Sequence, residues 1–148
     1  MVNLTKVEGL LHNLREYLSQ LYNAATLSFQ DLTSDPLKLS GVKYYLQVAI
    51  EACVDIANHI IASEHLRAPQ TYTDTFVVLN EQGILPEDFT QTCVQMAKTR
   101  NRLIHLYREV DGQELYKIIT TELGVFDTFV RYILHYLNIP NPPAQSRP

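Results

Sequence analysis

The sequence predicts an all-α protein, built as an antiparallel bundle of four to five helices. Apolar residues recur at steps of three and four along most of the chain, the spacing that places them on one face of a helix. No stretch alternates apolar and polar residues between hairpin turns, and no internal repeat or long linker divides the chain. Short connections favour neighbouring antiparallel helices, and we expect a single helical domain over residues 1–138.

The composition supports one ordinary globular domain and excludes several function classes. With 148 residues, 46% of them hydrophobic, the chain can bury a core without disulfides or a structural metal. The net charge of -4 argues against a broad basic surface for nucleic acid, so any such contact must be local. Cys53 and Cys93 lie far apart on apolar helix faces, which favours buried free thiols over a disulfide.

Neither a targeting segment nor a membrane partner is expected. Residues 1–6 lack the charged and apolar regions of a signal peptide, and no apolar run reaches the roughly 18 residues of a membrane span. We therefore expect a cytoplasmic protein.

The first two predicted helices cover the N-terminal half. One runs from Leu4 to about Leu27, and a break at residues 31–36 leaves Asp35 and Pro36 as N-cap and first-turn residue of the second, which continues to about His65. The apolar stripe of the first helix comprises Leu4, Val7, Leu11, Leu14, Leu18, Leu21 and Ala25. The apolar face of the second comprises Leu39, Val42, Leu46, Ala49, Cys53, Ile56 and Ile60.

Three further helices are predicted in the C-terminal half. A short one, residues 75–82, is capped by Thr73 or Asp74 and closed by Gly83. Another starts near Pro86 and buries Phe89, Cys93, Met96 and Ala97. A last, widely apolar helix is predicted over residues 113–137, after a turn at residues 111–112. Residues 139–148 form a proline-rich tail that cannot continue a helix and that we expect to be disordered.

A polar stripe on the second helix, made by Glu51, Asp55 and His59, raises the question of a metal site. A bundle metal site normally takes ligands from two or more helices, and the paired Glu-x-x-His pattern of carboxylate-bridged iron is missing. The stripe is better interpreted as a solvated face or as a partner for arginines of a neighbouring helix. We expect neither a bound metal nor a cofactor, since phosphate-binding and dinucleotide-binding glycine motifs are also missing.

Residues 98–108 hold four of the twelve Lys and Arg residues together with a histidine and a tyrosine. Within this stretch, Arg100 offers a planar, permanently charged fork for phosphate oxygens, and His105 can exchange a proton near neutral pH. Such a pair permits RNA cleavage without a metal, in which the ribose 2'-hydroxyl attacks its own phosphate. A solvated basic helix end is the structural alternative for the same residues.

Helix geometry places a condition on the pair. At about 100° per residue, positions five apart lie about 140° from each other around a helix. Arg100 and His105 can therefore act together only if the helix ends or distorts near His105, or if a second copy completes the site across a symmetric dimer interface.

The string Arg100-Asn101-x3-His105-x-Tyr107 resembles the Arg-x4-His-x-Tyr motif of the HepT family of HEPN-domain toxins. Residues 44–57 and 107–111 are also similar to that family, and the resemblance covers roughly residues 4 to 137. It implies a HEPN-like, homodimeric, metal-independent endoribonuclease, the toxin of a type VII-like toxin–antitoxin module. Its substrate would be RNA, with tRNA among the candidates, rather than DNA.

The resemblance also implies a partner, an MntA-like nucleotidyltransferase antitoxin that transfers AMP from ATP to the motif tyrosine. On this chain Arg100 and His105 become the catalytic pair, Asn101 supports them, and Tyr107 is modified. Two groups of residues are expected to assist. Glu51 and Asp55 would orient Arg100, and the cations expected to bind phosphate or RNA are Lys98, Arg102 and Arg108.

An AMP group on Tyr107 would place a phosphate beside Arg100 and Arg102, where it would compete with RNA phosphate for the same cations. Two rival functions use the same residues. The chain could be a non-catalytic helical subunit that binds a nucleotidyltransferase and presents RNA without cutting it. Alternatively it is only the target subunit, with modification of Tyr107 controlling assembly.

Overall fold

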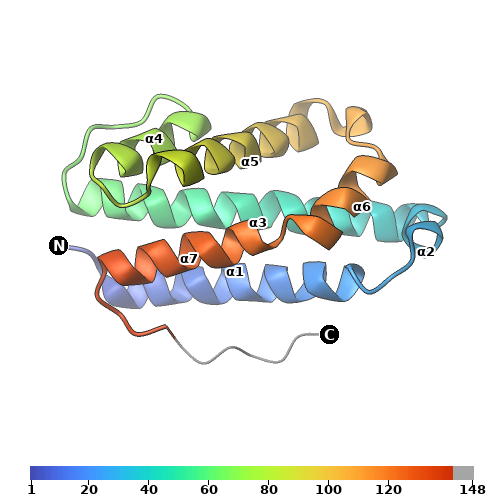
Figure 1. Ribbon diagram of the computed structural model, residues 1–148, viewed down its shortest axis with the longest axis horizontal. Helices are drawn as coiled ribbons and strands as arrows, with labels where there is room; N and C mark the ends of the chain where they lie inside the picture. The colour runs from blue at the N-terminus through green and yellow to red at the C-terminus, as the bar shows by residue number, and fades with distance from the viewer. Residues whose placement is uncertain (142–148) are drawn as a thin grey trace.

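The computed structural model describes residues 1–141 and confirms the all-α prediction, since this part of the chain contains helices and no strand. α1 (Leu4–Ala24) and α3 (Pro36–Ser63) run the length of the molecule (Figure 1). The remaining elements are α2 (Phe29–Thr33), α4 (Tyr72–Glu81), α5 (Glu87–His105), the 3-10 turn η1 (Tyr107–Glu109), α6 (Gly112–Thr121) and α7 (Gly124–Tyr136).

α3 is the central helix of the bundle. Figure 1 shows α4 and α5 along one side of it and α1 along the other. Asp35 caps α3 as predicted, its carboxylate accepting from the N–H groups of Leu37 and Lys38 at 3.0 and 3.3 Å, and Pro36 occupies the first turn. Each apolar residue predicted on this helix is buried except Leu39, which is partly buried against the core.

Central burial also explains the high apolar content of α3. By length and composition this helix could cross a membrane, but 56% of its most apolar window is buried inside the bundle. The burial of α3 agrees with the expectation that no apolar run reaches a membrane span. A helix covered on both sides by other helices needs no solvated face over most of its length.

The amphipathic stripe of α1 is largely confirmed. Val7, Leu11, Leu14, Leu18 and Leu21 are buried. The helix ends at Ala24 rather than near Leu27, and the following residues lead into α2, a short helix that the sequence pattern did not reveal. Leu4, at the start of the stripe, is exposed.

α4 and α5 form a helical hairpin closed by Gly83. Gly83 has φ +74°, a left-handed conformation that glycine adopts without a Cβ clash, so its predicted role after the helix is confirmed. The N-cap of α4 is Thr71, whose hydroxyl accepts from the Asp74 N–H, and not Thr73 or Asp74. The helix therefore starts earlier than predicted, which brings Tyr72 into its first turn.

The prediction of a single long helix over residues 113–137 is wrong. The chain forms α6 and α7 with a break at Glu122 and Leu123, immediately before Gly124. The break lets the two segments pack on different parts of the bundle. The Tyr116 hydroxyl on α6 donates to the Leu27 carbonyl at 3.1 Å, whereas the buried ring of Phe129 on α7 meets Phe76 of α4 edge-on.

The core also contains both cysteines. Cys53 and Cys93 are free and buried, as predicted, and burial raises the pKa of the Cys93 thiol to about 12. At the other end of the domain, α7 ends at Tyr136, and the Ile139 N–H donates to the Leu134 carbonyl at 2.9 Å. Most of the predicted proline-rich tail, residues 142–148, lies outside the described residues.

Candidate active site

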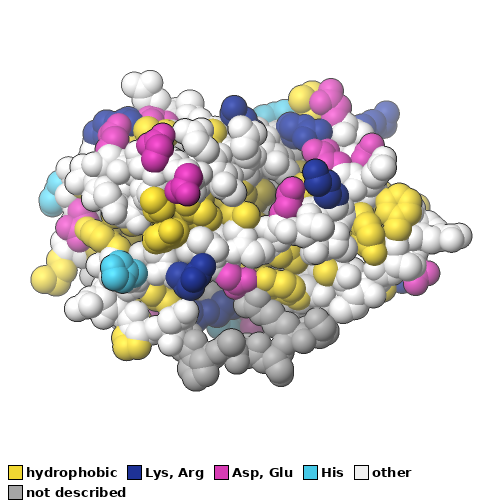
Figure 2. All heavy atoms as spheres, viewed as in Figure 1, with side chains coloured by type: hydrophobic (Ala, Val, Ile, Leu, Met, Phe, Trp, Pro, Cys, Tyr) yellow, Lys and Arg dark blue, Asp and Glu magenta, His cyan; other side chains and the backbone are white. Residues whose placement is uncertain are grey.

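The helix that carries the motif ends at its histidine, His105. α5 stops at His105, and Leu106 leaves the helical region with φ -132° and ψ 46°. Tyr107 then begins the η1 turn. A helix end at His105 is one of the two alternative conditions for Arg100 and His105 to act together, and α5 has this end. Figure 2 shows Lys and Arg side chains, interspersed with Asp and Glu, over this end of α5.

Arg100 is held by two other helices. Its Nε donates to Glu51 Oε1 of α3 at 3.0 Å, and its Nη2 donates to the Tyr72 hydroxyl of α4 at 3.1 Å. The guanidinium also stacks on the Tyr72 ring, 4.0 Å from the centroid. Only 13% of the Arg100 side chain is exposed, so its orientation is fixed before any ligand arrives.

Two polar neighbours complete this arrangement. Asn101 Oδ1 accepts from Arg100 Nη1 at 3.3 Å, and Gln47 Nε2 donates to Glu51 Oε1 at 3.2 Å. The hydrogen bonds of Arg100 within residues 1–141 use three of the five N–H donors of a guanidinium. Donors therefore remain for an anion such as a phosphate.

His105 is exposed at the last residue of α5. No hydrogen bond within the described chain joins it to Arg100, which faces α3 and α4 instead. The two residues are also separated by about 7.5 Å along the helix axis, from a rise of about 1.5 Å per residue. One chain thus brings both groups to the same end of α5 without placing them in contact.

Tyr107 lies against the N-terminal half of α3. Its hydroxyl donates to Ser40 Oγ at 2.9 Å, and its ring lies under the Lys43 ammonium, 4.0 Å from Nζ to the centroid. Lys43 Nζ also donates to the Tyr107 carbonyl at 3.0 Å. The residue as a whole is 42% exposed. The turn is therefore fixed on α3 while one side of the ring faces solvent.

The cations predicted to bind phosphate have different environments. Arg102 forms a two-point ion pair with Glu114 of α6, with Nη2 2.9 Å from Oε2, and this partner raises the pKa of the guanidinium. Lys98 and Arg108 are exposed. Neither of these two is in an ion pair within residues 1–141, whereas Arg102 would have to leave Glu114 before it could bind another anion.

The three residues of the polar stripe on α3 have different surroundings. Glu51 contacts Arg100, whereas Asp55 is exposed and has no hydrogen bond within residues 1–141. Although the residue is exposed, neighbouring atoms exclude part of the water around the Asp55 carboxyl, which raises its pKa, and the nearby Glu51 charge adds to this effect. His59 Nε2 accepts from the Asn3 N–H at 3.2 Å. Across the described chain, no group of three His, Cys, Asp or Glu side chains is placed to hold a metal ion.

Four residues of the site escaped the sequence interpretation: Tyr72, Lys43, Ser40 and Gln47. Three of them lie on the same helix as Glu51 at spacings that share or adjoin its face, which was the available signal. No sequence signal pointed to Tyr72, because its contact with Arg100 depends on how α4 packs against α5.

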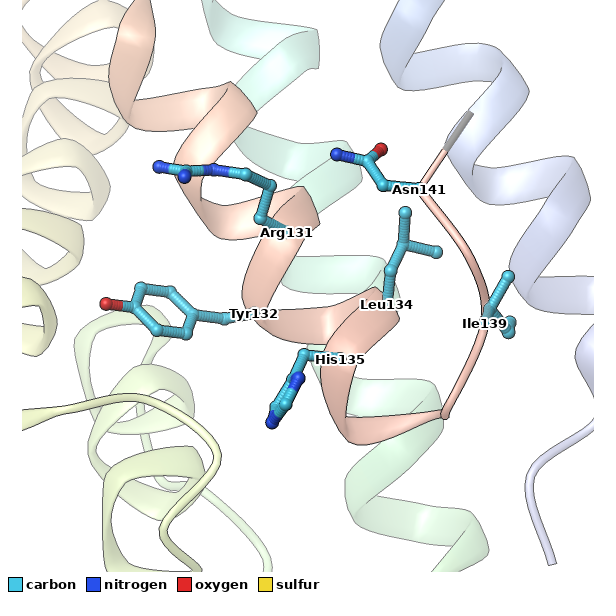
Figure 3. A pocket seen from close by; sticks show the side chains of 6 residues that line it. All are labelled: Arg131, Tyr132, Leu134, His135, Ile139 and Asn141. Atoms are coloured by element: carbon cyan, nitrogen blue, oxygen red, sulfur yellow. The ribbon is translucent and has the colours of Figure 1, made fainter. Parts of the chain in front are cut away.

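Two hollows on the described surface lie away from the motif residues. One, of about 490 Å³, is at the C-terminal end of α7 and is lined by Arg131, Tyr132, Leu134, His135, Ile139 and Asn141 (Figure 3). The other, of about 550 Å³, surrounds Arg67, whose guanidinium is bound to Asp74 and Glu81. Neither hollow is lined by a motif residue.

The geometry fits anion chemistry at the end of α5. A fixed, mostly buried guanidinium lies on the helix that ends in an exposed imidazole, and an exposed tyrosine follows two residues later. The buried ammonium of Lys43 supports the turn between α5 and α6. A model of the ribonuclease HepT-like family matches residues 11–133. The chain belongs to this family.

Relatives of this HepT-like chain include two nucleases. The mRNA nuclease HepT of Shewanella oneidensis is 28% identical over 116 residues, 78% of this chain and 84% of the relative. The tRNA nuclease HepT of Aphanizomenon flos-aquae is 27% identical over 133 residues, 88% of this chain and 89% of the relative.

Solved structures share the fold. The tri-AMPylated HEPN toxin of Shewanella oneidensis, in complex with an MNT antitoxin, superposes with a TM-score of 0.80 at 22% identity, covering 87% of this chain and 96% of that one. YutE of Bacillus subtilis, a cytosolic protein of unknown function, gives a TM-score of 0.79 at 22% identity, covering 93% and 92%. The HEPN-like fold predicted from the motif is therefore confirmed.

Proposed function

We propose that this chain is a metal-independent endoribonuclease toxin in which Arg100 and His105 form the catalytic pair. The observation that supports it best is the fixed Arg100, held by Glu51 and Tyr72 with donors left for a phosphate. The two HepT nucleases that match most of this chain cleave mRNA and tRNA by name, which supports RNA as the substrate. A cytoplasmic location suits such a substrate.

In the proposed reaction the 2'-hydroxyl of a ribose attacks the adjacent phosphorus. His105 removes the hydroxyl proton, and the new O–P bond closes a 2',3'-cyclic phosphate. The bond from phosphorus to the 5'-oxygen of the next nucleotide breaks, and that oxygen takes a proton from solvent. Arg100 stabilises the negative charge that builds on the non-bridging oxygens in the transition state. Asn101 and Glu51 keep the guanidinium in one orientation during this step.

A homodimer would supply the missing contact between Arg100 and His105. Exposed apolar side chains support such an interface: Leu37 and Tyr44 lie seven residues apart on one face of α3. Leu106 is exposed as well. Large apolar side chains that remain exposed in this way are typical of a protein interface. The mass in solution should be about twice the 17.0 kDa of one chain.

Control by modification is the second part of the proposal. A structural neighbour is a tri-AMPylated HEPN toxin in complex with an MNT antitoxin, which supports an MntA-like nucleotidyltransferase as partner and AMP transfer to Tyr107. Tyr107 suits this role because the residue is exposed and lies two residues after His105, at the start of η1. An attached nucleotide would occupy the space that RNA needs and bring a competing anion to the site.

RNA cleavage in the presence of EDTA tests the proposed activity. The wild type should convert tRNA or total RNA into fragments ending in 2',3'-cyclic phosphate, and Arg100→Ala should lower the initial rate by about a hundredfold or more, the usual size for a lost transition-state contact. Arg131→Ala, an exposed arginine on α7, is the matched control and should cleave normally. Tight RNA binding without cleavage would instead favour the non-catalytic binding subunit.

A further inference from the structure

Lys43 is an unusual residue for its position. It is the one charged side chain among the buried residues of positions 1–141, with 5% of its surface exposed. Buried lysines are rare and normally have a partner of opposite charge. No carboxylate within the described chain forms an ion pair with Lys43. The fold thus retains a buried positive charge without neutralising it.

Within residues 1–141, the hydrogen bond and the cation–π contact of Lys43 both involve Tyr107. Its ammonium donates to the Tyr107 carbonyl at 3.0 Å and lies 4.0 Å above the centroid of the Tyr107 ring. An ammonium has three N–H donors, so the single hydrogen bond leaves two for another acceptor. The Tyr107 hydroxyl is held by Ser40, which lies three residues before Lys43 on the same face of α3.

Other nearby cations are less suited to an anion on Tyr107. Both terminal nitrogens of Arg102 are bound to Glu114 of α6. The guanidinium of Arg100 is turned toward Glu51 and Tyr72. Of the charged groups in the described chain, Lys43 is the one in contact with the Tyr107 ring.

We propose that Lys43 binds the phosphoryl group attached to Tyr107, and that it thereby promotes transfer to this tyrosine and fixes the modified turn. This inference rests on the proposed modification of Tyr107. In the transfer, the Tyr107 oxygen bonds to the α-phosphorus of ATP, the bond from that phosphorus to the β-phosphate oxygen breaks, and pyrophosphate leaves. The phenol proton passes to solvent, and the product is a phosphodiester with one negative charge.

The negative charge of the phosphodiester would supply the counter-ion that Lys43 lacks within residues 1–141. An ammonium that is removed from water gains most from an anion that accepts its remaining N–H groups. The phosphodiester would also hold the Tyr107 ring and carbonyl to one side chain of α3, and the adjacent His105 would lose its freedom to approach RNA. The modified toxin would then be inhibited by a fixed turn as well as by the bulk of the nucleotide.

The test measures the rate of AMP transfer to Tyr107 in charge variants of Lys43. The purified chain is incubated with ATP and an MntA-type nucleotidyltransferase, and the adduct is located by tandem mass spectrometry. Lys43→Met and Lys43→Gln should slow transfer about tenfold or more, as expected for a lost hydrogen bond to a charged group. Lys43→Arg, which keeps the charge, should stay within a few-fold of the wild type.

Controls separate charge from structure. Lys117→Met, an exposed lysine on α6, should react like the wild type. Equal rates for the wild type and Lys43→Met would overturn the inference, and so would a full rate for Lys43→Gln, because that amide keeps a donor without the charge. If circular dichroism shows that Lys43→Met does not fold, the rates of Lys43→Arg and Lys43→Gln still test the inference. Absence of any adduct on wild-type Tyr107 would instead refute the proposed modification itself.

Discussion

Glu51→Gln is the most informative single change at the Arg100 site. The carboxylate of Glu51 accepts from Arg100 Nε at 3.0 Å and lies 3.0 Å from Nη2, and the two side chains are 26% and 13% exposed. An amide of the same shape keeps an acceptor but removes the charge. Arg100 would then remain in its partly buried position without a counter-ion.

The expected cost follows from this intermediate burial. Exposed ion pairs contribute up to about 1 kcal/mol, whereas removing one partner of a fully buried pair costs about 3–5 kcal/mol. For Glu51→Gln we expect a loss of about 1–2 kcal/mol, since the amide oxygen still accepts a hydrogen bond. For a chain of this size that loss lowers Tm by roughly 2–8 °C. RNA cleavage should fall about tenfold or more as Arg100 loses its fixed orientation.

Asp55→Asn is the matched control, the same change one helical turn away. Asp55 has no hydrogen bond to Arg100, and the raised pKa of its carboxyl means that its charge at pH 7 opposes folding. The control should therefore keep or slightly raise Tm and should cleave RNA normally. Thermal unfolding followed by circular dichroism, together with initial cleavage rates, measures both effects. Equal losses in the two variants, or full cleavage by Glu51→Gln, would refute the orienting role of Glu51.

Two further predictions concern stability. Gly83→Ala should destabilise the fold by about 1–2 kcal/mol because φ at this position is +74°. Gly9→Ala should stabilise it by about 0.5–1 kcal/mol, since the added Cβ lies in open space inside α1. Urea unfolding measures both effects, and the same sign for both variants would contradict the prediction. Arg67 lowers the pKa of Asp74 to about 2, so this pair stabilises above the ordinary pKa of 3.8, and its contribution is lost as the pH falls toward 2. Asp74→Asn should accordingly lower Tm at pH 7 but not near pH 2, and an equal decrease at both would contradict the assignment.

Local sequence signals predicted the helix ends that depend on a single residue. Asp35 with Pro36, and Gly83 after α4, act through cap bonds and backbone conformation within a few residues. The break between α6 and α7 was missed although Gly124 follows it, because the apolar pattern continues across Leu123. Continuous periodicity indicates helix but does not show where a helix is interrupted.

The candidate site was predictable only in part, for a related reason. The motif identified Arg100, His105 and Tyr107, and the polar stripe on α3 suggested Glu51. The contact between Tyr72 and Arg100 spans 28 residues, and that between Lys43 and Tyr107 spans 64. Such contacts arise from the packing of α3, α4 and α5, which periodicity and spacing do not encode.

The central claim is that His105 is the proton acceptor of a ribonuclease. The most direct measurement compares initial rates of RNA cleavage, in EDTA at pH 7, for His105→Ala and for His135→Ala, an exposed histidine on α7. We expect His105→Ala to lose about a hundredfold or more, the range typical of general-base removal, with an unchanged circular dichroism spectrum. His135→Ala should retain the wild-type rate. Undiminished cleavage by His105→Ala would contradict the claim.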